Sequence, residues 1–362
     1  MAACEDGNSC VWDIITRTFV CSYQQDSSVK SIHCRENSSK IVTGSGNGKV
    51  SIWDINIKSY LRVYKMRPST EVNSITWSEE NKMFALGCED GSLHLYKNNQ
   101  PTPSKSFKRA QAIRNITLRA LEKYHLLVTE SNGKVHLLDV RKNKPLKILI
   151  PKESVNYVAD CSTSHLIAAS GDNGVIYIWD PRMHSKSKVV CLKGHEGAVS
   201  TLKFTKDMQV ISGGDDGTIR TWSFAKAQQV GYFSDEKLGA IESLAISPDE
   251  EHMAVASGKK VILWSKDQSN TFAWSCNRIY RGHQAKVHCV AFLPNSLIAS
   301  AGEDKDIHIF ELDETATPII FSGHTNTIVD LTTSSEASYE SFNEIEIASA
   351  NNDSTVRFWK IK

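Results

Sequence analysis

The stretch "IAASGDNGVIYIWDPR", residues 167–182, joins an apolar run, a glycine-containing turn and a second run in which apolar and polar residues alternate up to Trp179-Asp180. Alternation with a period of two is typical of a β-strand. Asn-Gly and Asp-Gly pairs supply the positive backbone angles that two-residue hairpins need. We therefore interpret this stretch as two antiparallel strands joined by a tight two-residue turn.

A similar ending recurs along the whole chain, at intervals of 41, 43, 42, 41, 43, 42, 46 and 49 residues. Each period also holds a third apolar run before these two and a fourth, more polar run after them, without helix signals. Four strands per period predict one small antiparallel sheet per repeat. The recurring positions are Trp12, Trp53, Tyr96, Leu138, Trp179, Trp222, Trp264, Phe310 and Trp359.

Three periods carry a Gly-His pair, at Gly194-His195, Gly282-His283 and Gly323-His324, followed by a turn Asp and then Trp or its substitute. This pattern resembles the WD-repeat family over essentially the whole chain. The resemblance implies an all-β fold, a WD-repeat β-propeller, in which four-stranded blades circle a central channel. We expect one domain over residues 1–362 with eight blades, and seven blades as the alternative.

In this family a His, a Ser, an Asp and a Trp form a buried hydrogen-bonded chain within a blade, and the resemblance transfers these roles to matching positions only. We interpret the matches as structural, since a buried polar group without its partner costs about 1–3 kcal/mol. In the second set Phe310 replaces the Trp and has no indole donor. The matches are His195, Ser212, Asp216 and Trp222; His283, Ser300 and Asp304; and His324, Ser349, Asp353 and Trp359.

Closure of the ring is less regular in the sequence. Relatives usually complete the last blade with an outer strand from the N-terminus, here "TFVCSY" at residues 18–23. The stretch "GNSCVWD" at residues 7–13 is a further strand with no partner before it, so residues 1–17 resemble a remnant of an incomplete blade. Two explanations stay open: this strand is displaced, or the chain is the later part of a longer, tandem-ring protein.

Composition and motifs point away from catalysis. The chain has 362 residues, of which 40% are apolar and 23% charged, as in ordinary globular proteins. Its nine cysteines include no C-x-x-C pair, "TGSGNGKV" at residues 43–50 does not match a phosphate loop, and His283 with His288 lacks a third ligand. We expect no enzyme activity, no cofactor, no metal and no membrane association. We expect a cytoplasmic or nuclear location.

The opening stretch also resembles the W-D-x-R motif of propeller substrate receptors in cullin-RING ubiquitin ligases, in which the Arg helps to dock the ligase adaptor. Asp180 and Arg182 match the motif, and Leu138-Asp139-Val140-Arg141 is a degenerate copy one period earlier. The resemblance implies adaptor docking through Arg141 and Arg182. The alternative is an ordinary solvated Arg in a turn.

Cations follow the third strand in three neighbouring repeats. Residues 53–193 carry 22 Lys and Arg against 13 Asp and Glu, whereas residues 194–362 carry 15 against 23. We predict a basic rim that nucleic acid could contact, with a merely solubilising surface as the alternative. The residues are Lys97, Lys105, Lys108, Arg109, Arg141, Lys142, Lys144, Lys147, Arg182, Lys186 and Lys188.

The opposite face is where the family most often binds peptides, and the matching positions are mostly polar. Only Arg114 is of a type that commonly anchors interfaces, so a charge-steered contact is expected. The overall prediction is a non-catalytic interaction scaffold, with a ligase substrate receptor and a nucleic-acid-associated propeller as alternatives. The candidates are Glu71, Asn73, Glu89, Arg114, Asn156, Ser200, Asp215, Glu242, Lys286, His288, Glu303 and Asn352.

Overall fold

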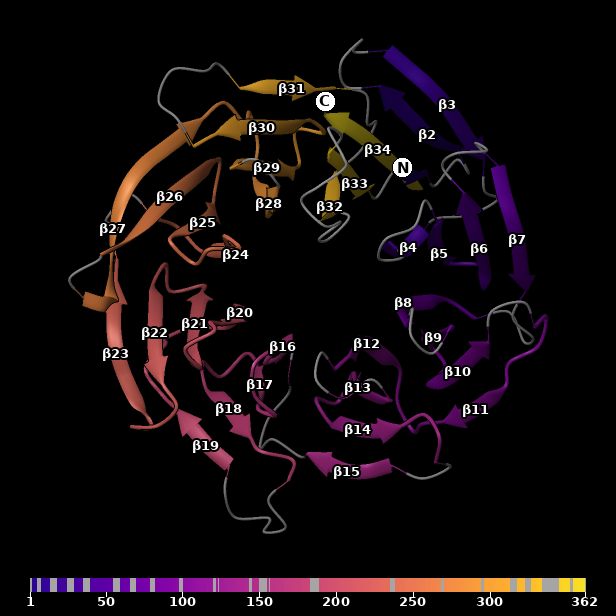
Figure 1. Cartoon of the computed structure of the whole chain (residues 1–362), viewed down its shortest axis with the longest axis horizontal. Coiled ribbons are helices and arrows are strands. Elements are labelled where there is room, and N and C mark those ends of the chain that lie inside the picture. The colour runs from indigo at the N-terminus through magenta and orange to yellow at the C-terminus, as the bar shows by residue number, and fades with distance from the viewer. Residues whose placement is uncertain are drawn as a thin grey trace.

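The computed structural model describes a ring of small β-sheets around a common axis (Figure 1). The described residues form 34 strands and no helix. None of them belongs to a helix that could cross a membrane. The described residues are 2–4, 8–13, 18–24, 29–34, 40–54, 59–65, 70–78, 82–97, 100–119, 122, 124–142, 145–149, 155, 157–182, 189–234, 238–267, 270–293, 296–312, 318–322, 327–333, 345–351 and 354–361.

Seven sheets contain four strands that are consecutive in the chain, and each neighbouring pair within them is antiparallel. The first four are β4 (Val29–Cys34), β5 (Lys40–Ser45), β6 (Lys49–Asp54) and β7 (Ser59–Lys65); β8 (Val72–Ser78), β9 (Met83–Cys88), β10 (Ser92–Lys97) and β11 (Lys105–Lys108); β12 (Ile113–Leu118), β13 (His125–Glu130), β14 (Val135–Asp139) and β15 (Pro145–Leu149); and β16 (Tyr157–Asp160), β17 (Ile167–Ser170), β18 (Ile176–Trp179) and β19 (Val189–Leu192). The next three are β20 (Val199–Phe204), β21 (Gln209–Gly214), β22 (Ile219–Ser223) and β23 (Gln228–Phe233); β24 (Ile241–Ile246), β25 (His252–Ser257), β26 (Lys260–Asp267) and β27 (Asn270–Arg281); and β28 (Val287–Leu293), β29 (Leu297–Gly302), β30 (Ile307–Glu311) and β31 (Ile319–Phe321).

An eighth sheet of six strands combines the two ends of the chain. Its strand order is β3-β2-β34-β33-β32, and β1 also pairs with β34. The prediction of an all-β propeller built from four-stranded sheets is confirmed, and eight sheets stand around the ring (Figure 1). The strands of this sheet are β1 (Ala2–Cys4), β2 (Asn8–Asp13), β3 (Thr18–Gln24), β32 (Ile328–Thr333), β33 (Ile345–Asn351) and β34 (Ser354–Ile361).

The prediction for ring closure is wrong in one respect. Residues 18–23 were expected beside the last strand of the chain, but β2 pairs with β34 in parallel, through Cys10–Arg357 and Val11–Phe358. The strand β3 then pairs with β2 as the outermost strand. The strand at residues 8–13 is therefore displaced into the last sheet, because its backbone groups find hydrogen-bonding partners on the edge of β34.

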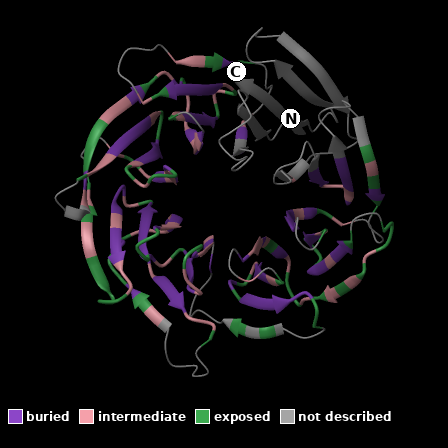
Figure 2. Cartoon of the chain, in the orientation of Figure 1, coloured by how far each residue is buried: buried purple, intermediate pink, exposed green. Residues whose placement is uncertain are grey.

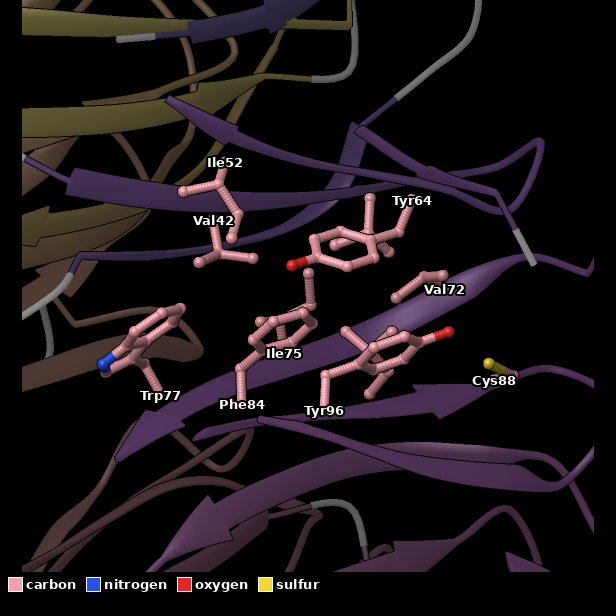
Figure 3. Close-up of a cluster of buried hydrophobic side chains, with 11 residues drawn as sticks. Val42, Ile52, Tyr64, Val72, Ile75, Trp77, Phe84, Cys88 and Tyr96 are labelled. Carbon is pink, nitrogen blue, oxygen red and sulfur yellow. The ribbon is translucent and has the colours of Figure 1, made fainter. Parts of the chain in front are cut away.

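Hydrophobic side chains fill the space between consecutive sheets. Figure 3 shows one such cluster, in which Phe84 stacks on Tyr96 with ring centroids 5.0 Å apart and on Trp77 at 5.6 Å. Tyr64 reaches across from β7 and meets the Phe84 ring edge-on at 5.4 Å. Each blade is thus covered by a neighbouring blade on both faces, which is why its middle strands, such as β9 and β14, are almost wholly buried. Exposed residues concentrate on outer strands such as β11 and β23 (Figure 2).

The hairpins after the second strand of each blade differ from the two-residue turns expected. In five of them a glycine with positive φ, between 69° and 80°, donates its N–H to the carbonyl three residues earlier. The Asn or Asp before each of these glycines does not adopt positive φ. A type I turn followed by one left-handed residue matches this pattern, because type I′ needs positive φ at both central residues. The glycines are Gly48, Gly91, Gly133, Gly174 and Gly217.

Candidate functional site

Seven of the eight innermost strands, all except β16, have a β-bulge near their first described residue. In β20, Val199 pairs with Gly214 and Thr201 with Gly213, so Ser200 is the extra residue and has no residue paired with its backbone on β21. The same irregularity occurs in β4, β8, β12, β24, β28 and β32. Bulges re-aim the side chain of the extra residue. Five of the predicted peptide-face residues stand at these bulges: Asn73, Arg114, Ser200, Glu242 and His288.

The other described candidates lie at the same end of the sheets. The backbone N–H of Glu89 donates to the carbonyl of Glu71, and that of Glu303 donates to the carbonyl of Lys286. Asp215 makes the equivalent bond to the carbonyl of Ala198. The structure therefore brings the bulged residues and the residues before the turns together on one face. Asn156 and Asn352 lie outside the described residues.

A polar cavity of about 420 Å³ opens between two neighbouring blades on this face. Its lining includes Asn73, Glu89, Arg114 and Ser131. The amide of Asn73 donates to Glu89 Oε2 at 2.6 Å and to the carbonyl of Ile113, on the next blade, at 3.0 Å. Arg114 is exposed at the cavity, so its guanidinium is available to a ligand on this surface.

Charge pairs connect other blades on this face. Lys286 Nζ lies 2.7 Å from Glu242 Oε1, across the boundary between two sheets. His288 Nε2 lies 3.5 Å from Glu303 Oε1. Ser200 donates to the carbonyl of Ile241 on the next blade. The described candidates hold five carboxylates and two cations, Arg114 and Lys286, so this set of ten residues carries three more negative than positive charges.

The predicted His-Ser-Asp-Trp chain has its full set of contacts in one blade. His195 Nδ1 lies 3.0 Å from both oxygens of Asp216, and its Nε2 lies 2.8 Å from Ser212 Oγ. The indole of Trp222 donates to the same Ser212 Oγ at 2.8 Å. Burial lowers the pKa of His195, although the Asp216 carboxylate opposes this shift.

The second set has the same arrangement without the indole. His283 Nδ1 lies 2.6 Å from Asp304 Oδ2, and its Nε2 lies 2.7 Å from Ser300 Oγ. Phe310 packs against Tyr280 with ring centroids 4.5 Å apart. Of the third set, His324 and Asp353 lie outside the described residues, and Ser349 and Trp359 lie on β33 and β34.

The two copies of the W-D-x-R pattern have the same local geometry at the opposite end of adjacent blades. Arg182 donates from Nε and Nη2 to the two oxygens of Asp180, at 3.0 and 2.7 Å, and its backbone N–H donates to Oδ1. Arg141 makes the same three contacts with Asp139. These bonds lower the pKa of Asp139 to about 2. Both arginine side chains remain exposed, at 59% for Arg141 and 64% for Arg182.

The prediction of one continuous basic rim is wrong. Antiparallel pairing sets Lys105 opposite Leu95 but Lys108 opposite Ser92, so the two ends of β11 carry cations to opposite faces. Lys108 pairs with Asp90 at 2.7 Å, and Arg109 is half-buried beside Gly91. Lys97, Lys105, Arg141, Lys142 and Arg182 remain at the W-D-x-R end, and Lys147 lies mid-strand on β15. Lys144, Lys186 and Lys188 lie outside the described residues.

Sequence reasoning missed a set of hydrogen bonds that join neighbouring inner strands. The hydroxyl oxygens of Ser31, Ser74 and Ser243 each accept a hydrogen bond from a backbone N–H at 3.0–3.3 Å. In each case the donor lies on the innermost strand of the following blade. For Ser243 that donor is Val290. The signal was present as the recurring pattern "VKSI", "VNSI" and "IESL" at the bulges. These bonds hold the bulged face of one blade against the next.

Curated proteins with similar sequences have varied descriptions. A zebrafish p21-activated protein kinase-interacting protein 1-like is 28% identical over 209 residues, which cover 55% of this chain and 50% of that protein. The fission-yeast target of rapamycin complex subunit wat1 is 23% identical over 198 residues, covering 52% of this chain and 63% of that protein. This chain thus matches less than two thirds of either relative.

Solved structures support the fold, and the repeat itself identifies the family. The crystal structure of Saccharomyces cerevisiae Sqt1 superposes with a TM-score of 0.80 at 12% identity, over 98% of this chain and 99% of that one. The computationally designed Ika8 protein gives 0.77 at 18% identity, over 93% and 97%. The family described as "WD domain, G-beta repeat" matches residues 16–54, 59–97, 143–180, 186–223, 274–311 and 316–360. These segments span more than half of the sequence, and the chain belongs to the WD40 repeat family.

Proposed function

We propose that this chain is a non-catalytic interaction scaffold that binds a basic segment of a partner protein on its polar face. The observation that carries the proposal is the set of ten described residues at the bulges and before the turns, in which five carboxylates outnumber two cations beside a polar cavity. Relatives described as kinase-interacting, complex-subunit and receptor-associated proteins support a scaffold role. A rigid ring presents several loops at once, which suits this role.

Charge complementarity gives the proposed contact its specificity. Exposed carboxylates such as Glu89, Asp215 and Glu303 attract cationic side chains and repel acidic ones. Arg114 is the one arginine among the predicted peptide-face residues, which include no tryptophan, so aromatic anchoring contributes little there. The binding is therefore expected to weaken as salt rises, because exposed charges are screened.

A peptide-binding comparison tests this function. Purified chain is titrated against twelve-residue peptides that are identical except for four Lys, four Glu or four Ser. We expect the Lys peptide to bind best. The triple variant Glu89→Gln, Asp215→Asn and Glu303→Gln should bind it about tenfold more weakly, at about 0.5 kcal/mol per exposed charge.

A matched control removes three carboxylates from the opposite end of the sheets. Asp207→Asn, Glu251→Gln and Glu311→Gln change the net charge equally but lie away from the bulges. This variant should bind the Lys peptide like the unmodified chain. Equal affinity for the Lys and Glu peptides would contradict the proposal, as would equal losses in the two triple variants.

A second candidate function rests on the matching geometry of Arg141 and Arg182. Both guanidinium groups are exposed on adjacent blades and held in one orientation by their own Asp. We propose that this pair docks the adaptor of a cullin-RING ligase. Replacing both with Ala should abolish co-purification of the adaptor, while Lys142→Ala, which removes a neighbouring exposed cation, should not. Unchanged recovery with the double variant would refute this function.

A further inference from the structure

We propose that His283, Asp304 and His308 form a binding site for one divalent zinc ion inside the blade β28–β31. One ligand atom from each residue lies within 4.8 Å of the others. All three side chains are almost wholly buried, with exposures of 1%, 4% and 3%. Two imidazoles and one carboxylate are a ligand set that Zn²⁺ accepts, with a fourth position left to water. The inference is independent of the scaffold function.

Two buried polar atoms in this cluster lack a hydrogen-bonding partner. They are Asp304 Oδ1 and His308 Nδ1. Buried polar groups are nearly always satisfied, and an unpaired buried carboxylate oxygen is costly. A cation that also contacts Asp304 Oδ1 would remove the cost at that oxygen, whereas His308 Nδ1 would keep its cost because the ring presents Nε2 to Asp304. The orphaned atoms are therefore an observation separate from the closeness of the three residues.

The blade β20–β23 has a cation beside the buried Asp that corresponds to Asp304. There Arg220 pairs across the strands with Ser212, and His308 pairs with Ser300 in the same register. Arg220 Nη2 lies 3.7 Å from Asp216 Oδ2, so a guanidinium accompanies that buried carboxylate. His308 stands in the position of the arginine, and no Lys or Arg of the described residues forms an ion pair with Asp304. A metal ion would supply the positive charge.

The missing indole makes the required change of tautomer easier. Coordination through Nδ1 of His283 displaces the proton that faces Asp304, so Nε2 must then carry a proton and donate it to Ser300 Oγ. No indole donates to Ser300 because Phe310 replaces the Trp, whereas Trp222 already occupies Ser212 Oγ in the other blade. A hydrogen bond on the second ring nitrogen is typical of metal-binding histidines.

Two separations of candidate ligand atoms bracket the value expected around zinc, in a cluster where the His283 and His308 rings pack against each other with centroids 3.8 Å apart. His283 Nδ1 lies 2.6 Å from Asp304 Oδ2, and His308 Nε2 lies 4.0 Å from the same oxygen. Ligand atoms of tetrahedral zinc are about 3.3 Å apart, which lies between these two values. A cavity of about 380 Å³ borders His283, and we expect metal to reach the cluster from this side. Lys259 and Arg281 also line it, so we expect the metal to enter faster at higher salt.

Metal titration of the full chain tests the site. Chelator-stripped protein is titrated with Zn²⁺ against a competing chromophoric chelator, and Co²⁺ is added separately to record the absorption of a four-coordinate site. We expect one ion to bind per chain. His308→Gln and His308→Arg, the latter copying Arg220, should weaken zinc binding more than about 100-fold, while His252→Ala should leave it unchanged.

A further variant keeps all three ligands and changes only their support. Phe310→Trp returns an indole to Ser300, which opposes the required tautomer, and should weaken zinc binding by about tenfold. Circular dichroism without metal checks the fold of every variant. The site would be overturned if the wild-type protein gave no cobalt spectrum or bound zinc more weakly than about 100 µM. Equal zinc affinity of the His308→Gln and Phe310→Trp variants would also overturn it.

Discussion

Lys305 occupies a backbone conformation that glycine adopts in five equivalent turns. Its φ is 73°, and its N–H donates to the carbonyl of Gly302 as Gly217 does to Gly214. Residues with a Cβ disfavour this left-handed region because the Cβ crowds the following carbonyl. The neighbouring Asp304 keeps its place in the His283–Ser300 chain, so the turn forms despite the strain.

Replacing Lys305 with Gly should stabilise the protein. We expect the free energy of unfolding to rise by about 0.5–1 kcal/mol. The backbone strain that Gly relieves in the folded state exceeds the entropic cost of its greater freedom in the unfolded chain. Urea denaturation measures the change. Gly217→Ala, where the added Cβ would meet the carbonyl oxygen of Gly239 at 3.3 Å, should have the opposite sign. A destabilised Lys305→Gly variant would contradict this explanation.

Single contacts between sheets hold the elements in register around the ring. Arg119 follows β12, and its Nε donates to Asp160 at the end of β16 over 2.8 Å. Its Nη2 donates to the carbonyl of His165 at 2.9 Å. The two side chains are 1% and 6% exposed, so this is a buried ion pair between adjacent blades.

Removing one partner of this ion pair should strongly lower the free energy of unfolding. Asp160→Ala leaves the Arg119 guanidinium buried without its counter-charge, which costs about 3–5 kcal/mol. Arg182→Ala removes an exposed partner of Asp180 and should cost no more than about 1 kcal/mol. Parallel chemical denaturation of the two variants measures both. Equal losses would show that burial of the pair does not matter.

Several histidines in the described part of the ring are buried or half-buried and favour the neutral form. Desolvation lowers the pKa of His94, His125, His136 and His195, and it lowers that of His308 to about 4. In the unfolded chain these groups take up protons near their ordinary pKa of about 6.5. Below that pH the unfolded state therefore binds more protons than the folded state, and the stability that the neutral histidines provide is lost as pH falls.

The free energy of unfolding should decrease when the pH is lowered from 7 to 5. His195→Asn removes one of these groups and should show a shallower decrease, beside an overall loss of stability. A second loss is expected below about pH 5, where Asp139, whose pKa the Arg141 hydrogen bonds hold at about 2, begins to be protonated in the unfolded chain. Denaturation curves at several pH values test both. A stability that rises between pH 7 and 5 would contradict the sign.

The sequence by itself determined the repeating unit, because the information lies within each stretch of some forty residues. Alternation and turn residues such as those of "IAASGDNGVIYIWDPR" act on nearest neighbours, so they specify a four-stranded sheet wherever they occur. The polar positions at the starts of inner strands could also be read from the repeat, and the bulges place them on one face.

Only the tertiary structure decided what depends on contacts between distant residues. The insertion of β2 beside β34 joins the two ends of the chain. No local sequence pattern predicts with which free strand edge β2 will pair. The basic residues divide because antiparallel register sends the two ends of β11 to opposite faces. His283, Asp304 and His308 meet through strand register and burial, and their spacing in sequence resembles no metal motif. The physical reason is that strand pairing and packing are cooperative over the whole ring, whereas turn and strand propensities are local.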